Sequence, residues 1–134
     1  MRHMLWIAFL LLSFLTSCIH HEVENFSLIG RWEVAQVSGG ITGKGYKPLF
    51  KYMEIIDSSR CQWRDSLLEV MVTARCWISP ESVKKGQMYF FDFNPDTIDV
   101  IDTYQVQYSF MGADTLLLDE GCCDRYQYEF VRVE

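Results

Sequence analysis

Residues 103–110, TYQVQYSF, decide the fold class, because apolar and polar side chains alternate there without a break. Residues 125–130, RYQYEF, repeat this alternation near the end of the chain. A period of two places successive side chains on opposite faces of a β-strand. A sheet with one buried and one water-exposed face is typical of antiparallel pairing. The two stretches therefore predict an all-β, antiparallel domain.

Seven further stretches have the composition of strands, namely 31–38, 50–57, 59–64, 67–77, 87–93, 97–101 and 114–119. The total of nine does not suit an up-and-down barrel, which closes antiparallel only with an even number of strands. Residues 66–74 also suit a short helix, so we expect 59–77 to supply one strand plus irregular or helical material. The predicted fold is a single antiparallel up-and-down β-barrel of about eight strands.

Residues 1–17 have the layout of a targeting segment. Arg2 and His3 precede a ten-residue apolar run, 5–14, which is the length of a secretory signal core and too short to span a bilayer. The following Leu15-Thr16-Ser17-Cys18 resembles the bacterial lipobox. That resemblance implies that Cys18 is acylated and becomes the first mature residue. The alternative is an ordinary secretory peptide in which Cys18 has no special role.

The predicted organisation is a lipoprotein signal peptide (1–17), a lipidated cysteine with a short tether (18–27) and a barrel domain (28–134). A lipid anchor implies the membrane as partner, and we expect the outer membrane of a Gram-negative bacterium. Loss of Arg2 with the signal peptide changes the net charge of the chain from −6 to −7. An acidic surface argues against nucleic acid as a partner.

Two positions suggest a family. Gly30-Arg31-Trp32 opens the first predicted strand, and Arg132 lies on the last. Together they resemble the structural signature of lipocalin-like, calycin-type barrels. The resemblance implies that Trp32 closes the barrel floor and that Arg132 packs across its ring. We then expect the connections 39–48, 78–86 and 120–124 to surround the open end.

Histidine is missing from the predicted domain, because His3 lies in the signal peptide and His20 and His21 lie in the tether. This excludes histidine-based nucleophilic catalysis and histidine-ligated metal or haem. We therefore expect no catalytic residue, no metal and no cofactor, and a non-enzymatic function.

Four cysteines remain in the domain: Cys61, Cys76, Cys122 and Cys123. An even number in an exported chain favours two disulfides over a zinc site, whose usual close cysteine pairs are missing. If Asp65-Ser66 formed a two-residue turn, Cys61 would face Val70 and Cys76 would lie near 20 Å away, at about 3.4 Å per residue. We therefore expect Cys122 and Cys123 to reach back separately to Cys61 and Cys76.

Six aromatic side chains are expected to face the barrel interior: Trp63, Tyr104, Tyr108, Phe110, Tyr126 and Tyr128. They could fill the core, or they could line a cavity in which tyrosine hydroxyls meet a ligand. The leading hypothesis is that the domain binds a small, largely apolar ligand in this cavity. The alternative is a protein-interaction module, such as an inhibitor or an accessory subunit of an envelope complex, with a packed core.

Overall fold

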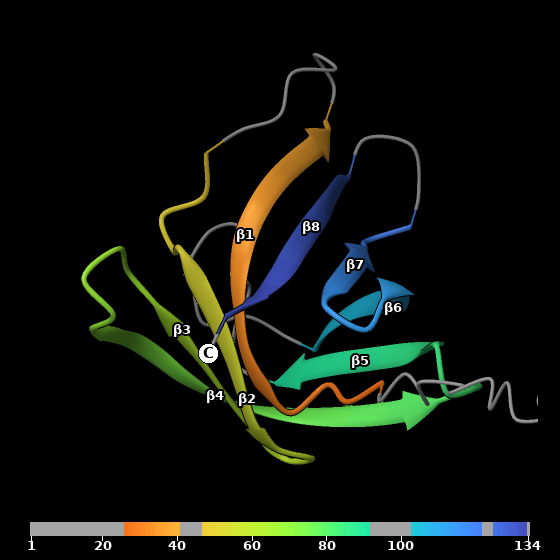
Figure 1. Ribbon diagram of the computed structural model, residues 1–134. Coiled ribbons are helices and arrows are strands. Elements are labelled where there is room, and N and C mark those ends of the chain that lie inside the picture. The colour runs from red at the N-terminus through yellow and green to blue at the C-terminus, as the bar shows by residue number, and fades with distance from the viewer. Residues whose placement is uncertain (1–25, 41–46, 92–102, 122–124, 134) are drawn as a thin grey trace, which may run out of the picture.

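Eight antiparallel strands form a closed barrel in the computed structural model, which describes residues 26–40, 47–91, 103–121 and 125–133 (Figure 1). Each strand pairs with the next along the chain, and the last pairs with the first. The strands are β1 (Gly30–Gly39), β2 (Tyr52–Asp57), β3 (Arg60–Arg64), β4 (Val70–Pro80), β5 (Lys85–Phe91), β6 (Tyr104–Gly112), β7 (Thr115–Asp119) and β8 (Tyr126–Val133). The predicted all-β, up-and-down barrel is confirmed. No helix in the described ranges is long and apolar enough to cross a bilayer.

The barrel has eight strands, as expected, but residues 59–77 contribute to it in a different way. Residues 59–77 are not one strand with irregular material, since β3 and β4 are separate strands joined by residues 65–69. The Asp65 carboxylate fixes this loop by accepting hydrogen bonds from the backbone N–H groups of Leu67 (2.8 Å) and Glu69 (3.0 Å). Leu68 takes a left-handed conformation, with φ of 66°, which ends any helical path. The ninth candidate, 97–101, lies outside the described residues.

The strand count also decides which connections share an end of the barrel. We call the end at Trp32 the floor and the opposite end the mouth. Because the chain reverses at every strand, the turns 58–59, 81–84 and 113–114 lie at the floor. The β3–β4 loop, 65–69, lies at the mouth.

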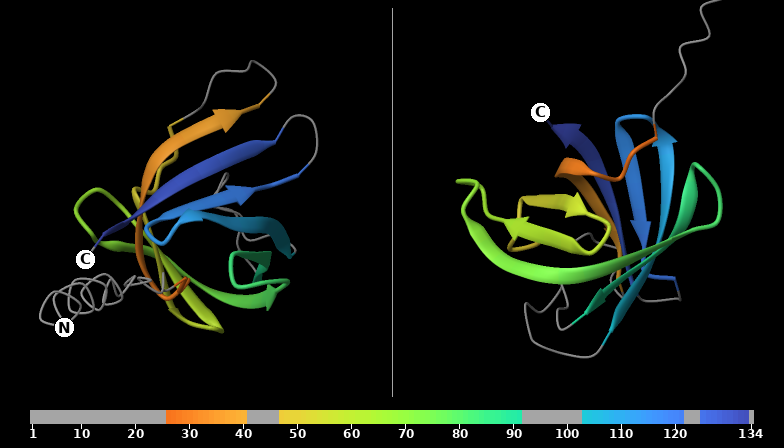
Figure 2. Two further views of the ribbon diagram at one scale, coloured as in Figure 1. Left: turned by 45° about the vertical axis from the view of Figure 1, so that its right-hand side comes forward. Right: turned by 90° about the horizontal axis from the view of Figure 1, so that it is seen from below.

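The expectation that 78–86 borders the open end is therefore wrong. Lys84 shows this directly, since its carbonyl accepts the N–H of Phe110 (2.7 Å) and its ammonium lies 4.7 Å from the ring of Phe26. Figure 2 shows the first described residues, in orange, beside the β6–β7 hairpin and the end of β8. The N-terminal segment thus joins the floor.

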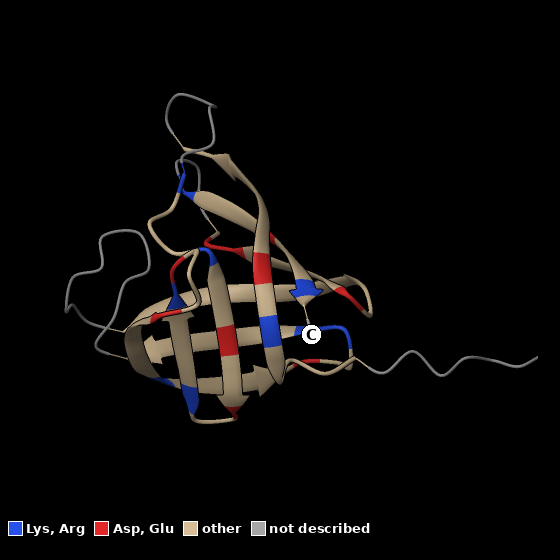
Figure 3. Ribbon diagram, turned by 60° about the vertical axis from the view of Figure 1, so that its left-hand side comes forward, with Lys and Arg blue, Asp and Glu red and all other residues tan. Residues whose placement is uncertain are grey.

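Side chains that face inward alternate with outward ones along every strand and form one apolar cluster. Fully buried members come from all around the barrel: Trp32, Met53, Ile55, Cys61, Trp63, Met88, Phe90, Leu116 and Phe130. On the outer face, Glu54 of β2 pairs with Arg31 (3.3 Å) and Arg64 (2.6 Å) on the neighbouring strands. Figure 3 shows acidic and basic bands lying side by side across these strands. These side chains are only partly buried, and ion pairs at a protein surface contribute about 0–1 kcal/mol each, so the core dominates stability.

The turn between β2 and β3 is held by Asp57. Its carboxylate accepts hydrogen bonds from the Ser59 N–H (2.9 Å), the Ser59 hydroxyl (2.7 Å) and Arg60 Nε (2.9 Å). The bonds from Ser59, followed by that from Arg60, lower the pKa of Asp57 from 3.8 to about 2. These contacts favour the ionised carboxylate in the folded state.

A pH-dependent contribution to stability follows from this turn. Because the folded-state pKa is the lower one, the contribution of Asp57 is complete above pH 3.8 and is lost as the pH falls towards about 2. Asp57→Asn should remove this part of the pH dependence. Denaturant unfolding of both proteins across that interval measures the effect. Parallel profiles for the two proteins would show that another group is responsible.

Candidate functional site

The floor of the barrel is built around Trp32. This side chain is completely buried, and its Nε1 donates a hydrogen bond to the carbonyl of Leu28 (2.9 Å). The β1–β8 register sets Trp32 directly opposite Arg132. The guanidinium carbon of Arg132 lies 4.2 Å from the centre of the Trp32 ring, which is within cation–π distance. The structure thus places the two residues in the arrangement that the family resemblance implies.

Arg132 also ties the N-terminal segment to the barrel. Its Nη1 donates to the carbonyl of Ile29 (3.1 Å), its Nη2 donates to the carbonyl of Ser27, and its Nε lies 3.4 Å from the Asp114 carboxylate. Gly30 permits this approach, because a Cβ there would lie 2.8 Å from Nη1 and the backbone has φ of +135°. All three guanidinium nitrogens of Arg132 thus contact groups at the floor.

The six predicted cavity aromatics do not share one wall. Trp63, Tyr104 and Tyr128 line an inner space near the mouth. Tyr108 and Phe110 lie towards the floor, where Phe110 packs against Phe26 and Trp32 at ring distances of 5.4 and 6.0 Å. Tyr126, half-buried, lies beside Gly40 at the mouth.

The inner space is very small. Its volume is about 10 Å³, and the other walls are Phe50, Phe90, Val106, Leu118 and Phe130. A single water requires at least roughly 10–15 Å³, so this space among the described side chains has room for one water at most. The hydroxyl of Tyr104 is buried without a hydrogen-bond partner in this part of the chain. A hydroxyl so placed would bond a polar atom if the space widened.

Phe50 fills the mouth and is the residue that sequence reasoning missed. It precedes β2, and its ring packs edge-on against Trp63 (4.6 Å) and lies 5.9 Å from the ring of Tyr128. Alternation through Met53 and Ile55, which are buried, would have turned Phe50 outward. Since β2 begins only at Tyr52, the strand periodicity does not apply to it. No local signal in the sequence identifies this inward turn.

Larger hollows open at the surface of the barrel. At the floor, an apolar groove of about 410 Å³ is lined by Phe26, Leu28, Ile29, Ile78, Val83 and Phe110, among others. A second groove of about 240 Å³ lies between β1 and the chain that leads into β2. The buried side chain of Phe110 forms part of the first groove, and that of Phe50 forms part of the second.

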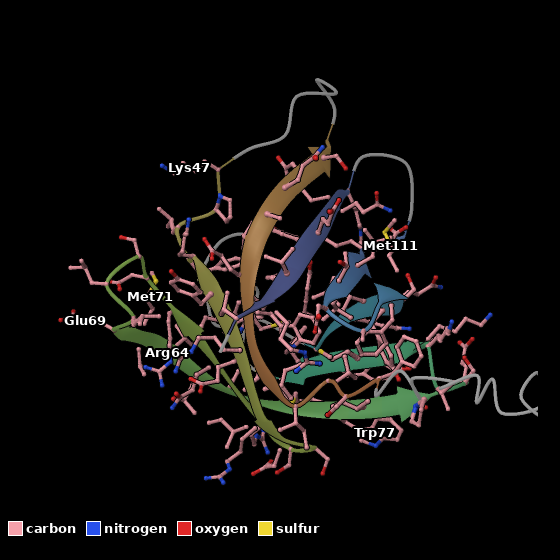
Figure 4. The ribbon with its side chains drawn as sticks, in the orientation of Figure 1. Lys47, Arg64, Glu69, Met71, Trp77 and Met111 are labelled. Carbon is pink, nitrogen blue, oxygen red and sulfur yellow. The ribbon has the colours of Figure 1, made fainter. Side chains whose placement is uncertain are left out.

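Exposed apolar side chains gather at the β3–β4 hairpin. We call Leu67, Leu68, Val70 and Met71 the hairpin rim; they are all exposed, and Leu67 reaches 78 %. Figure 4 shows Met71 at this hairpin, with Arg64 and Glu69 beside it. Arg64 braces the hairpin, because it donates to the carbonyl of Leu68 (2.8 Å) while it is bonded to Glu54. The rim therefore presents apolar surface from a rigid base.

Two of the four disulfide candidates lie together. Cys61 pairs in register with Ala74, not with Val70, so the predicted separation of Cys61 and Cys76 is wrong. Both side chains are buried thiols, and they donate to the backbone carbonyls of Ala74 (3.7 Å) and Asp57 (4.0 Å) respectively. The error came from assuming a two-residue turn where the chain uses the longer 65–69 loop. Cys122 and Cys123 lie outside the described residues, as does the lipidation candidate Cys18.

The described ranges contain no candidate metal site. No three His, Cys, Asp or Glu side chains there are placed to share a metal ion. Glu120 is buried, and its carboxylate accepts the N–H of Tyr126 (3.1 Å), which is a structural contact at the mouth.

Comparison of the chain with protein-family models, with curated proteins and with solved structures found no match.

Proposed function

We propose that this protein is a lipid-anchored, non-enzymatic protein-interaction module of the cell envelope, built on a lipocalin-like barrel with a packed core. The observation that carries the proposal is the combination of a filled interior, with about 10 Å³ of space, and exposed apolar side chains at the hairpin rim. Monomeric proteins rarely leave such side chains clustered unless a partner covers them. The rim is the contact surface in this proposal.

The proposed lipid anchor sets the orientation of the barrel relative to the membrane. In this proposal residues 1–17 are removed, Cys18 carries the lipid and residues 18–27 form the tether at the outer membrane of a Gram-negative bacterium. The described chain begins at Phe26, at the floor. Residues 18–25 span at most about 30 Å when extended. An anchored barrel would then keep its floor towards the bilayer and project the hairpin rim, at the mouth, towards soluble partners.

Site-specific photo-crosslinking tests the proposal. A photoreactive residue replaces Met71 at the rim or, as the matched control, Met111, an exposed methionine near the floor. We expect one discrete crosslinked partner from Met71 in intact cells and none from Met111. Leu67→Glu should reduce this adduct at least tenfold, because it places a charge in an apolar contact. Adducts that form equally from both positions, or that survive Leu67→Glu, would contradict the rim as the contact surface.

A second candidate is the binding of a small, largely apolar ligand inside the barrel. It is favoured by the buried hydroxyl of Tyr104, which has no hydrogen-bond partner among the described residues, and by the position of Phe50, which closes the space from outside the strand ladder. Binding would require Phe50 to leave its place. Native mass spectrometry of the purified protein tests this candidate, since a reproducible adduct that leaves on denaturation would favour a carrier.

A further inference from the structure

The side chains of Cys61 and Cys76 face the interior from adjacent strands. Cys61 lies opposite Ala74, and Cys76 follows two residues later on the same face of β4. The backbone holds this corner, because the N–H of Cys76 donates to the carbonyl of Ser59 (2.9 Å). Each thiol donates to a backbone carbonyl at this corner, Cys61 to Ala74 (3.7 Å) and Cys76 to Asp57 (4.0 Å), and both belong to the buried core. The two cysteines are therefore diagonal neighbours on the inner face of the β3–β4 ladder.

We propose that Cys61 and Cys76 form a disulfide that ties β3 to β4 across the barrel wall. The inference rests on the export that the proposed function includes, because disulfides persist in oxidising compartments. It replaces the expected links from these two residues to Cys122 and Cys123. The residues that flank that pair, Gly121 and Arg125, lie at the mouth, whereas Cys61 and Cys76 lie on the floor side of β3 and β4.

The chemistry is thiol–disulfide exchange with a disulfide oxidant, such as glutathione disulfide or an envelope oxidoreductase. In the unfolded chain either thiolate can react first, for example that of Cys76. Cys76 sulfur attacks the oxidant and releases one thiol. Cys61 sulfur then attacks Cys76 and releases the second. Both protein thiols lose a proton and an electron, and the oxidant's disulfide is reduced to two thiols.

The bond would enclose the proposed contact surface. Residues 62–75 lie between the two cysteines, and they include the entire hairpin rim. Closing a loop of this length restricts the unfolded chain and holds the base of the hairpin in register. Since both sulfurs are buried in the folded barrel, exchange takes place as the chain folds. The bond would therefore fix the rim before a partner is met.

Non-reducing peptide mapping tests the bond with the full chain, recovered from the envelope in mild detergent. Free thiols are alkylated under denaturing conditions, and the protein is cut with trypsin. Cleavage after each Lys and Arg places Cys61 on peptide 61–64, Cys76 on peptide 76–84, and Cys122 with Cys123 on peptide 86–125. We expect 61–64 linked to 76–84, with the link lost on reduction. Alkylated, separate peptides, or a link from either one to 86–125, would overturn the proposal.

Two further measurements test this disulfide independently of the proposed location and function of the protein. The denatured, reduced chain is refolded with glutathione and its disulfide; the same linked peptides are expected, and their absence would overturn the proposal wherever the protein resides. Reduction should lower the Tm by about 10 °C in the wild-type protein and in the control Cys122→Ser/Cys123→Ser variant. Cys76→Ala should abolish that sensitivity. None of these readouts involves a partner, so failure of the bond leaves the crosslinking result at the rim intact.

Discussion

Trp32→Ala is expected to lower the free energy of unfolding by about 4 kcal/mol, as for other large buried aromatic side chains. The side chain is fully buried at the floor, so its removal leaves a cavity that the closed strand ladder cannot collapse. The change also removes the hydrogen bond to Leu28 and the ring beneath the Arg132 guanidinium. Urea unfolding followed by circular dichroism measures the loss.

Trp77→Ala is the matched control for this change. Trp77 lies on the outer face of β4, is 56 % exposed and stacks on Tyr89 at 5.2 Å. Its removal forfeits one exposed ring contact and should cost about 1 kcal/mol or less. Equal losses from the two variants would mean that Trp32 is not the centre of the floor.

Phe50→Ala is expected to lower the free energy of unfolding by about 3 kcal/mol and to open the inner space at the mouth. The Phe50 ring fills the gap between Trp63 and Tyr128, and the remaining walls belong to strands that cannot move inward. A cavity the size of the removed phenyl ring, lined by apolar side chains, stays dry and accepts a small aromatic molecule. The variant should therefore bind benzene or indole, and the wild-type protein should not. Unfolding curves and ligand-observed NMR measure the two effects.

Leu49→Ala serves as the control for Phe50→Ala. Leu49 is the adjacent residue and is 70 % exposed, so its loss should change stability by at most about 0.5 kcal/mol and open no cavity. If wild-type protein and Phe50→Ala bind the probe equally well, Phe50 does not close the barrel. That outcome would favour the carrier function over the packed interaction module.

The strongest sequence predictions came from patterns that a strand expresses locally. Alternation over 103–110 and 125–130 corresponds to β6 and β8, with Val106, Tyr108, Tyr128 and Phe130 buried. Such a pattern is robust because a one-residue slip would turn the whole apolar face outward. The Gly30, Trp32 and Arg132 positions were found through a resemblance to known barrels, and the contact between them depends on the pairing of the two ends of the chain.

Predictions that depended on how the strands connect were less successful. The division of 59–77 into β3 and β4 depends on a loop fixed by Asp65. An error of a few residues in the predicted length of this loop shifted the predicted register and placed Cys61 far from Cys76. The same error reversed the end to which 78–86 belongs. Turn length is set by a few local hydrogen bonds, whereas the register it produces is a property of both strands.

The sequence by itself determined that this protein is an antiparallel barrel, because a period of two is a property of each strand alone. Only the tertiary structure decided that Phe50 fills the mouth, that Cys61 lies diagonally across from Cys76 and that four apolar side chains are left exposed on the β3–β4 hairpin. The physical reason is that each of these outcomes depends on closure of the ladder by β1 and β8 and on the register across β3 and β4. Those contacts join residues that no local pattern relates.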